Sequence, residues 1–284
     1  MLRSHCKRLR KSQAFPVLIP MRKFVIDHDL HLHSQLSLCS NDPKQTAGAL
    51  LEYGVREGLL DICVTDHYWD ENVPGASEWY AAQNFAHIAP ILPLPQDAAC
   101  KFHFGCEIDM DQFCTVGISP RMLDAFAFII VPTSHLHMTG FTIAPEDTSV
   151  ERRARLYLQR NHALLDMDLP FYKMGLAHFT CSLMARNCEG SRDDIVNAIS
   201  DAEYAELFAR VAKSGMGVEL NVNIEDPKSA DTMRPYRIAK AQGCKFYLGS
   251  DAHHPKNLTA ARARFEAVID ALELTEDDKF RPFG

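Results

Sequence analysis

Short apolar runs rich in β-branched residues alternate with longer amphipathic stretches along most of the chain. Apolar runs of about four to eight residues are typical of buried strands, and longer stretches with helical periodicity are typical of helices. The predicted strands are Phe24–His33, Asp61–His67, Lys101–Met110, Ala127–His135, Gly175–His178, Gly217–Asn223 and Lys245–Asp251. The predicted helices are Thr46–Glu57, Val150–Asp166, Asp201–Lys213, Asp231–Gln242 and Leu258–Leu272. This alternation predicts βα units and an α/β fold.

About seven strands in one continuous series favour a single (β/α) barrel over two domains, and 284 residues are enough for one. The first twenty residues differ from the rest, because they carry five Lys or Arg and no acidic residue. We therefore predict a disordered basic extension over residues 1–22 and one domain over residues 23–284. The segment Tyr68–Ala99 is irregular and predicts a long loop with a short helix near Ser77–Phe85.

Composition narrows the class of protein. The chain is 46% hydrophobic and 24% charged, as globular domains are, and its net charge of −7 argues against binding a nucleic-acid polymer. Nine cysteines without a C-x-x-C pair indicate free thiols in a reducing cytoplasm. No apolar stretch reaches the ~18 residues that a membrane-spanning helix needs. We therefore expect a cytoplasmic protein that contacts no membrane.

Histidine and acidic residues stand where the predicted strands end. The strand ends read HLH, TDH, CE, SH, AH and SDAH. In a parallel barrel these ends share one rim, so the side chains are expected to converge there. The residues are His31, His33, Asp66, His67, Glu107, His135, His178, Asp251 and His253. Each alone is more often a loop or cap residue, but the repetition favours a functional site.

The chemistry of this set is metal chemistry. Imidazole and carboxylate ligands together suit zinc, manganese or iron, and the set is too large for one ion. Glu107, near the middle of the series, is placed to bridge two ions. A two-metal site generates hydroxide at neutral pH and stabilises the attacking and leaving oxygens of an in-line displacement. The pattern therefore predicts hydrolysis of a phosphate ester.

The ordered series HLH, TDH, CE, SH, AH and GSDAH resembles the polymerase-and-histidinol-phosphatase (PHP) superfamily, from about Phe24 to the C-terminus. The resemblance implies a distorted seven-stranded (β/α) barrel that holds two or three divalent metal ions. It implies a first ion held by His31, His33, Glu107 and Asp251, and a second held by Glu107, His135 and His178. It implies a third ion held by His67 and His253 with one ligand from the loop after His33.

The loop ligand departs from the commoner pattern of the superfamily. The superfamily often has His or Asp there, whereas this chain offers Cys39, Ser40 and then Asp42. Cys39 as a thiolate is a suitable zinc ligand and is the residue we predict. The alternative is a buried thiol that binds no metal, which would leave the third site weak or empty.

The predicted mechanism is an in-line attack on phosphorus by a hydroxide that bridges the first two ions, with Glu107 and Asp251 as the carboxylates that hold them. Asp66 either orients a ligand imidazole or acts as a general acid or base. Arg186 and Arg234 are candidates to bind the phosphate, and surface arginines are the alternative. Glu219, in the sixth strand, has either a structural role or a contact with substrate.

The resemblance is to histidinol-phosphatase-like members, and it implies a small phosphate monoester as substrate: histidinol phosphate, a nucleotide or a related compound. One alternative is an amidohydrolase-type enzyme that cleaves a C–N bond. Against it, the third strand offers Glu107 instead of a modified lysine, and TDH and SDAH supply extra ligands. The other alternative, a non-catalytic barrel, requires broken ligand positions, and outside the Cys39 region they are intact.

Overall fold

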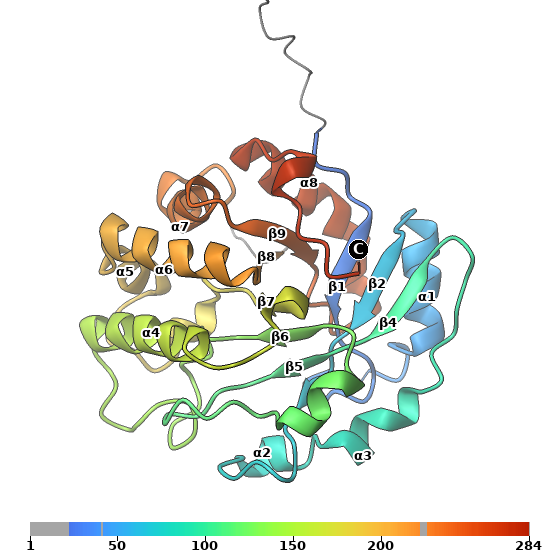
Figure 1. Cartoon of the computed structure of the whole chain (residues 1–284), viewed down its shortest axis with the longest axis horizontal. Coiled ribbons are helices and arrows are strands. Elements are labelled where there is room, and N and C mark those ends of the chain that lie inside the picture. The colour runs from blue at the N-terminus through green and yellow to red at the C-terminus, as the bar shows by residue number, and fades with distance from the viewer. Residues whose placement is uncertain (1–22, 41, 222–225, 284) are drawn as a thin grey trace, which may run out of the picture.

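The computed structural model describes residues 23–40, 42–221 and 226–283 as parallel strands surrounded by helices (Figure 1). The strands are β1 (His28–Leu32), β2 (Asp61–Val64), β3 (His67–Tyr68), β4 (Lys101–Phe104), β5 (Cys106–Ile108), β6 (Ile129–Val131), β7 (Met174–Leu176), β8 (Gly217–Asn221) and β9 (Lys245–Gly249). They form a three-stranded sheet, β1-β2-β4, and a six-stranded sheet, β3-β5-β6-β7-β8-β9, in which every pairing is parallel. The predicted α/β fold is confirmed.

Two of the seven predicted strands are each broken into two short ones, which is why there are two sheets. Thr65 and Asp66 separate β2 from β3, and Gly105 separates β4 from β5. A side chain at position 105 would clash, because a Cβ there would lie 2.7 Å from the sulfur of Cys63. Glycine therefore lets the chain pass from one sheet to the other where there is no room for a side chain.

The structure confirms the series of parallel strands predicted for the barrel. It does not confirm a closed barrel, because no continuous ladder of backbone hydrogen bonds joins β9 to β1. The carboxyl end of β1 does pair with the residues that follow β9. Asp251 N donates to His31 O at 2.8 Å, and His33 N donates to Ala252 O at 3.2 Å. These bonds bring the ends of the first and last strands together.

The predicted long helices are all present. The α-helices are α1 (Ala47–Arg56), α2 (Glu78–Ala81), α3 (Phe85–Ile88), α4 (Val150–Leu165), α5 (Arg192–Asn197), α6 (Asp201–Ser214), α7 (Ala230–Ala241) and α8 (Ala261–Leu272). The 3-10 helices are η1 (Ala89–Ile91), η2 (Pro120–Ala125), η3 (Phe171–Lys173), η4 (Ser182–Ala185), η5 (Pro255–Ala260) and η6 (Glu276–Asp278). Helix α6 begins at a capping box between Ser200 and Glu203, and Gly215 ends it with a left-handed backbone.

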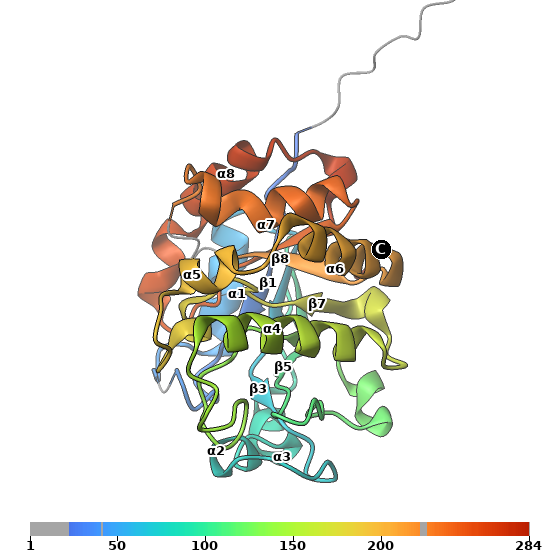
Figure 2. The ribbon, with the colours of Figure 1, turned by 90° about the vertical axis from the view of Figure 1, so that its left-hand side faces the viewer.

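The strands carry apolar side chains on both faces, as parallel strands covered by helices do. In Figure 2, α4, α6 and α7 cover the face of the six-stranded sheet that is turned to the viewer. One buried apolar cluster combines side chains from several strands and the segments beside them: Leu30, Cys63, Phe128, Ile130, Ala177, Tyr247 and Phe280. Across the part of the chain that the structure describes, no helix has the length and apolar character to span a membrane. The predicted extension over residues 1–22 lies outside the described residues.

Candidate metal centre

The predicted ligands converge at the carboxyl ends of the strands, where they surround one cavity of about 1240 Å³. The predicted ligands that line it are Cys39, His67, Glu107, His135, His178, Asp251 and His253. His31 and His33, at the end of β1, are fully buried and do not line the cavity. The rim position that the strand-end pattern predicts is therefore where these side chains lie.

The group predicted to hold the first ion is tightly clustered. His31 Nε2 lies 3.1 Å from His33 Nε2. Both nitrogens face the same two carboxylates: His31 Nε2 is 3.4 Å from Glu107 Oε2 and 3.3 Å from Asp251 Oδ1, and His33 Nε2 is 3.2 Å from each. Two donor nitrogens and two carboxylate oxygens facing one point form a suitable set for a zinc, manganese or iron ion.

Glu107 extends from this first group to a second one. Its other oxygen, Oε1, lies 3.3 Å from His178 Nε2. The rings of His178 and His135 are stacked, with their centroids 5.0 Å apart. Glu107 therefore presents one oxygen to each group, which is the geometry that a bridging carboxylate requires.

The third predicted group lies beside the first. Ligand atoms of His33, Cys39, His67 and His253 all lie within 4.8 Å of one another. The Cys39 sulfur is 3.3 Å from Ser37 Oγ, and His33 and His253 stack with centroids 4.2 Å apart. The structure thus brings Cys39 to the position predicted for the loop ligand.

Two buried atoms support the presence of cations here. Glu107 Oε1 and His67 Nδ1 are buried, yet neither makes a well-formed hydrogen bond to any described residue. Buried polar atoms of this kind are normally satisfied, so atoms without a partner inside a cluster of ligand-type groups need another partner. Divalent ions at the three groups would satisfy both atoms, and the residues present fit such ions.

The surroundings of the histidines shift their pKa values in opposite directions. Burial lowers the pKa of His67 to about 3 and that of His253 to about 4, so both rings are neutral and ready to bind a metal. Burial also opposes protonation of His33, but the hydrogen-bonded carboxylates of Asp251 and Glu107 raise its pKa to about 9. Burial raises the pKa of the Cys39 thiol to about 12. His33 and Cys39 must therefore lose protons when a metal binds.

Two of the predicted ligands have a left-handed backbone, which is rare for residues other than glycine. The φ angles are 24° at His178 and 52° at Asp251. Such conformations cost roughly 1–3 kcal/mol each and persist where the surrounding structure holds them, often at functional sites. Glu219 helps to hold the backbone of His178 in this conformation, because its Oε2 accepts a hydrogen bond from the backbone N–H of His178.

Buried carboxylates behind the ligands fix the orientation of the rings. Glu219 Oε1 accepts a hydrogen bond from His31 Nδ1 at 2.7 Å, and Asp109 Oδ2 accepts one from His135 Nδ1 at 2.9 Å. These bonds point the opposite nitrogen of each ring toward the cavity. Of the two roles left open for Glu219, the structural one matches this position. Asp109 was not predicted, although it follows Glu107 by two residues and so shares its strand face.

Asp66 lies behind His33 and does not line the cavity. Its Oδ1 accepts from Ser34 N at 2.7 Å and its Oδ2 accepts from Ser34 Oγ at 2.6 Å, while His33 Nδ1 is 3.9 Å away. Both oxygens are thus used to hold the turn that follows His33. Asp66 therefore faces this turn and the His33 ring, and not the cavity.

The two predicted phosphate-binding arginines have different surroundings. Arg186 is exposed and lines the cavity, together with Arg192 and Arg264, which the sequence did not single out. Arg234, the other arginine predicted to bind the phosphate, does not line this cavity. The guanidinium of Arg234, which is on α7, donates to Asp201 Oδ1 and to the carbonyls of Val196 and Ile199. These bonds join α7 to α5 and α6.

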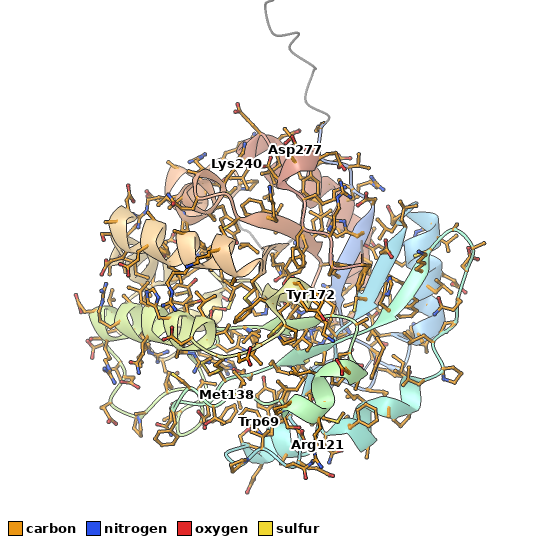
Figure 3. The ribbon with its side chains drawn as sticks, viewed as in Figure 1. Trp69, Arg121, Met138, Tyr172, Lys240 and Asp277 are labelled. Atoms are coloured by element: carbon orange, nitrogen blue, oxygen red, sulfur yellow. The ribbon has the colours of Figure 1, made fainter. Side chains whose placement is uncertain are left out.

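The long loop after β3 contributes one wall of the cavity. Trp79 and Tyr80 line the cavity, and their ring centroids lie 5.0 and 5.8 Å from that of His67. Trp69 instead packs in a separate cluster with Tyr80 and Phe141, against which Met138 also packs. Figure 3 shows Trp69 and Met138 near each other on this side of the molecule. The loop is therefore anchored by Trp69 and presents Trp79 to the cavity.

Comparison with models of protein families gives no match, and no curated protein matches the chain significantly. Solved structures do match. Histidinol phosphate phosphatase from Lactococcus lactis subsp. lactis Il1403, in complex with zinc, L-histidinol and phosphate, is 19% identical with a TM-score of 0.52, over 86% of this chain and 93% of that one. A putative histidinol phosphatase from Listeria monocytogenes is 14% identical with a TM-score of 0.57, over 84% and 99%. The chain is thus similar in fold to histidinol-phosphatase structures, as the motif series predicts.

Proposed function

We propose that this protein is a metal-dependent phosphatase that hydrolyses a small phosphate monoester. The observation that carries the proposal is Glu107, whose two oxygens face two separate groups of ligand-type side chains. The similarity in fold to a phosphatase solved with zinc and phosphate supports the same reading. The proposal includes one catalytic domain over residues 23–284, in which β1 and β9 close a distorted seven-stranded barrel, and a basic extension over residues 1–22.

The residues proposed to hold the ions follow the three groups. His31, His33, Glu107 and Asp251 hold the first ion; Glu107, His135 and His178 hold the second; Cys39, His67 and His253 hold the third. When bound, zinc, manganese or iron ions supply hydroxide at neutral pH, neutralise the phosphate oxygens and assist the leaving alkoxide. Glu219, Asp109 and Asp66 hold ligand rings or the turn beside them in place, so these carboxylates act as positioning residues.

Arginines on one side of the cavity are proposed to orient the phosphate. A guanidinium binds phosphate oxygens through paired hydrogen bonds, which fixes the ester for in-line attack. Arg186 is the first candidate, and Arg192 and Arg264 line the same cavity. Trp79 offers an aromatic surface to the remainder of the substrate. Histidinol phosphate is the first compound to test, because the similar Lactococcus structure holds histidinol and phosphate.

Phosphate release tests the proposal. The full chain, reconstituted with manganese or zinc, is given histidinol phosphate, mononucleotides and an aryl phosphate. Release that Glu107→Gln abolishes and Glu206→Gln, an exposed control on α6, preserves would support a metal-dependent phosphatase. A fully metal-loaded protein that releases no phosphate from any ester would refute it.

Two further measurements separate the alternatives. Hydrolysis of amides or lactams without phosphate release would favour the amidohydrolase-type enzyme. Failure to bind metal in metal-rich medium would favour a non-catalytic binding module. Neither alternative accounts for the intact ligand groups and the arginines in one cavity as well as phosphate ester hydrolysis does.

A further inference from the structure

Cys181 lies at the edge of the second ligand group. It follows His178 by three residues, just before η4, and its backbone N–H donates to His178 O at 2.9 Å. Its side chain is half-buried and lines the cavity. The thiol also contacts Ser134 Oγ at 3.4 Å, and the same oxygen lies 3.4 Å from His178 Nδ1. The turn after β7 therefore holds the sulfur beside the imidazole of His178.

The sulfur stands within reach of an ion at this group. The Cys181 sulfur and one ring nitrogen from each of His135 and His178 lie within 4.8 Å of one another. Zinc bonds of about 2.3 Å to sulfur and about 2.0 Å to nitrogen place such ligands roughly 3.6 Å apart in a tetrahedron. A small movement of the thiol therefore brings it into the coordination sphere.

A second observation points to a cation at the same place. Glu107 Oε1 faces His178 Nε2 at 3.3 Å and is buried without a well-formed hydrogen bond to any described residue. The Glu107 side chain is 1% exposed, so bulk solvent does not reach this oxygen. The Nδ1 atoms of both histidines face other residues, Asp109 for His135 and Ser134 for His178. Their Nε2 atoms are thus left for the ion.

We propose that Cys181, as a thiolate, is the fourth protein ligand of the ion held by Glu107, His135 and His178. The proposal rests on the metal centre of the proposed function. On binding, the S–H bond breaks, its proton passes to solvent, and the sulfur lone pair forms the bond to the metal; no oxidation takes place. Because thiolate is a soft ligand, it makes the second site selective for zinc over manganese. The first site, with only imidazole and carboxylate ligands, accepts either ion.

Cobalt(II) reconstitution tests the proposal without measuring catalysis. A cobalt ion bound by a thiolate shows a charge-transfer band in the near ultraviolet that imidazole and carboxylate ligands do not give. Cys39 is itself a predicted ligand at the third site, so the experiment is done on full-length Cys39→Ser protein. We expect this variant to keep a thiolate band and Cys39→Ser/Cys181→Ser to lose it. Cys39→Ser/Cys188→Ser is the matched control, since the half-buried Cys188 belongs to none of the ligand groups.

A folded, cobalt-loaded Cys39→Ser protein without a thiolate band would overturn the proposal, and this result does not depend on the folding of the double variant. A band that survives the additional Cys181→Ser change would overturn it as well. In zinc competition against a chelator, Cys181→Ser should weaken one bound zinc by roughly 10- to 100-fold or more and leave manganese binding nearly unchanged.

Failure of this inference and failure of the proposed function are distinguishable. Phosphate release by a protein whose Cys39→Ser form lacks the band refutes only the role of Cys181. A Cys181-dependent band in a protein that hydrolyses no phosphate ester refutes only the phosphatase.

Discussion

Replacing Glu219 with glutamine removes one negative charge from behind the first ligand group without changing the volume of the side chain. Glu219 is fully buried in β8 and accepts two hydrogen bonds, one from His31 Nδ1 and one from the backbone N–H of His178. A glutamine has only one oxygen that accepts. Its amide NH₂ must then face one of the two donors, whichever way the side chain is turned.

The size of the effect follows from these contacts. Loss of a carboxylate that orients a metal-binding histidine typically costs 10- to 100-fold in metal affinity, or about 1.4 to 2.7 kcal/mol at about 1.36 kcal/mol per factor of ten. The donor left without an acceptor is buried, which costs roughly 1–3 kcal/mol of folding stability. We expect both effects, because Glu219 touches one ligand ring and the backbone of another ligand.

The assay is zinc competition against a chelator, with thermal unfolding measured on the metal-free protein. Glu206→Gln, which makes the same chemical change on the exposed face of α6, serves as the control and should alter neither quantity. Zinc affinity of a folded Glu219→Gln protein that stays within about twofold of the original would refute the positioning role.

Three further predictions concern pH, packing and the arginines. Because the His33 ring in the metal-free protein has a pKa of about 9 and must be neutral to bind metal, metal affinity should rise between about pH 7 and about pH 9; a flat profile in chelator competition would contradict this. Gly249→Ala should destabilise the fold by roughly 1–3 kcal/mol in chemical denaturation, because the new Cβ would overlap Oε1 of Glu219. Gly48→Ala, at an exposed position, is the control and should not destabilise the fold. Arg186→Gln should raise KM for a phosphate ester with little change in thermal stability. Arg234→Gln should lower thermal stability and leave KM unchanged. The reverse pattern would show that the roles of the two arginines are misassigned.

The ligand-type residues at the strand ends could be predicted because each lies within a few residues of the apolar run that predicts its strand. A β-branched run that ends in HLH or SDAH carries both the strand and its ligands within a few residues. Placing Cys39 beside His67 and His253 required more, since the loop after β1 must fold back over the rim; the resemblance to a known superfamily supplied that placement. The left-handed backbone at His178 and Asp251 could not be predicted from the residue types, because His and Asp adopt it more often than most residues but still only uncommonly.

Other features depend on contacts between residues far apart in the chain. Arg234 follows the sixth strand, as a residue at the cavity would, but its side chain donates to the carbonyls of Val196 on α5 and of Ile199, which lies between α5 and α6. The break at Gly105 depends on the closeness of Cys63, forty-odd residues away in the sequence. Glu219 showed only a suitable strand face, and its pairing with His31 spans 188 residues. Periodicity predicts which face a side chain occupies but not which partner it meets there.

The residues predicted to hold the first ion come from both sheets, and this affects how metal binding would change the stability of the fold. His31 and His33 come from the three-stranded sheet, whereas Glu107 and Asp251 follow from strands of the six-stranded sheet. An ion held by all four side chains would therefore act as a crosslink between the sheets, at the level where β2 and β4 are interrupted. Binding of such an ion would hold the two sheets together, so the protein would gain resistance to unfolding in the same binding event that the proposed catalysis requires.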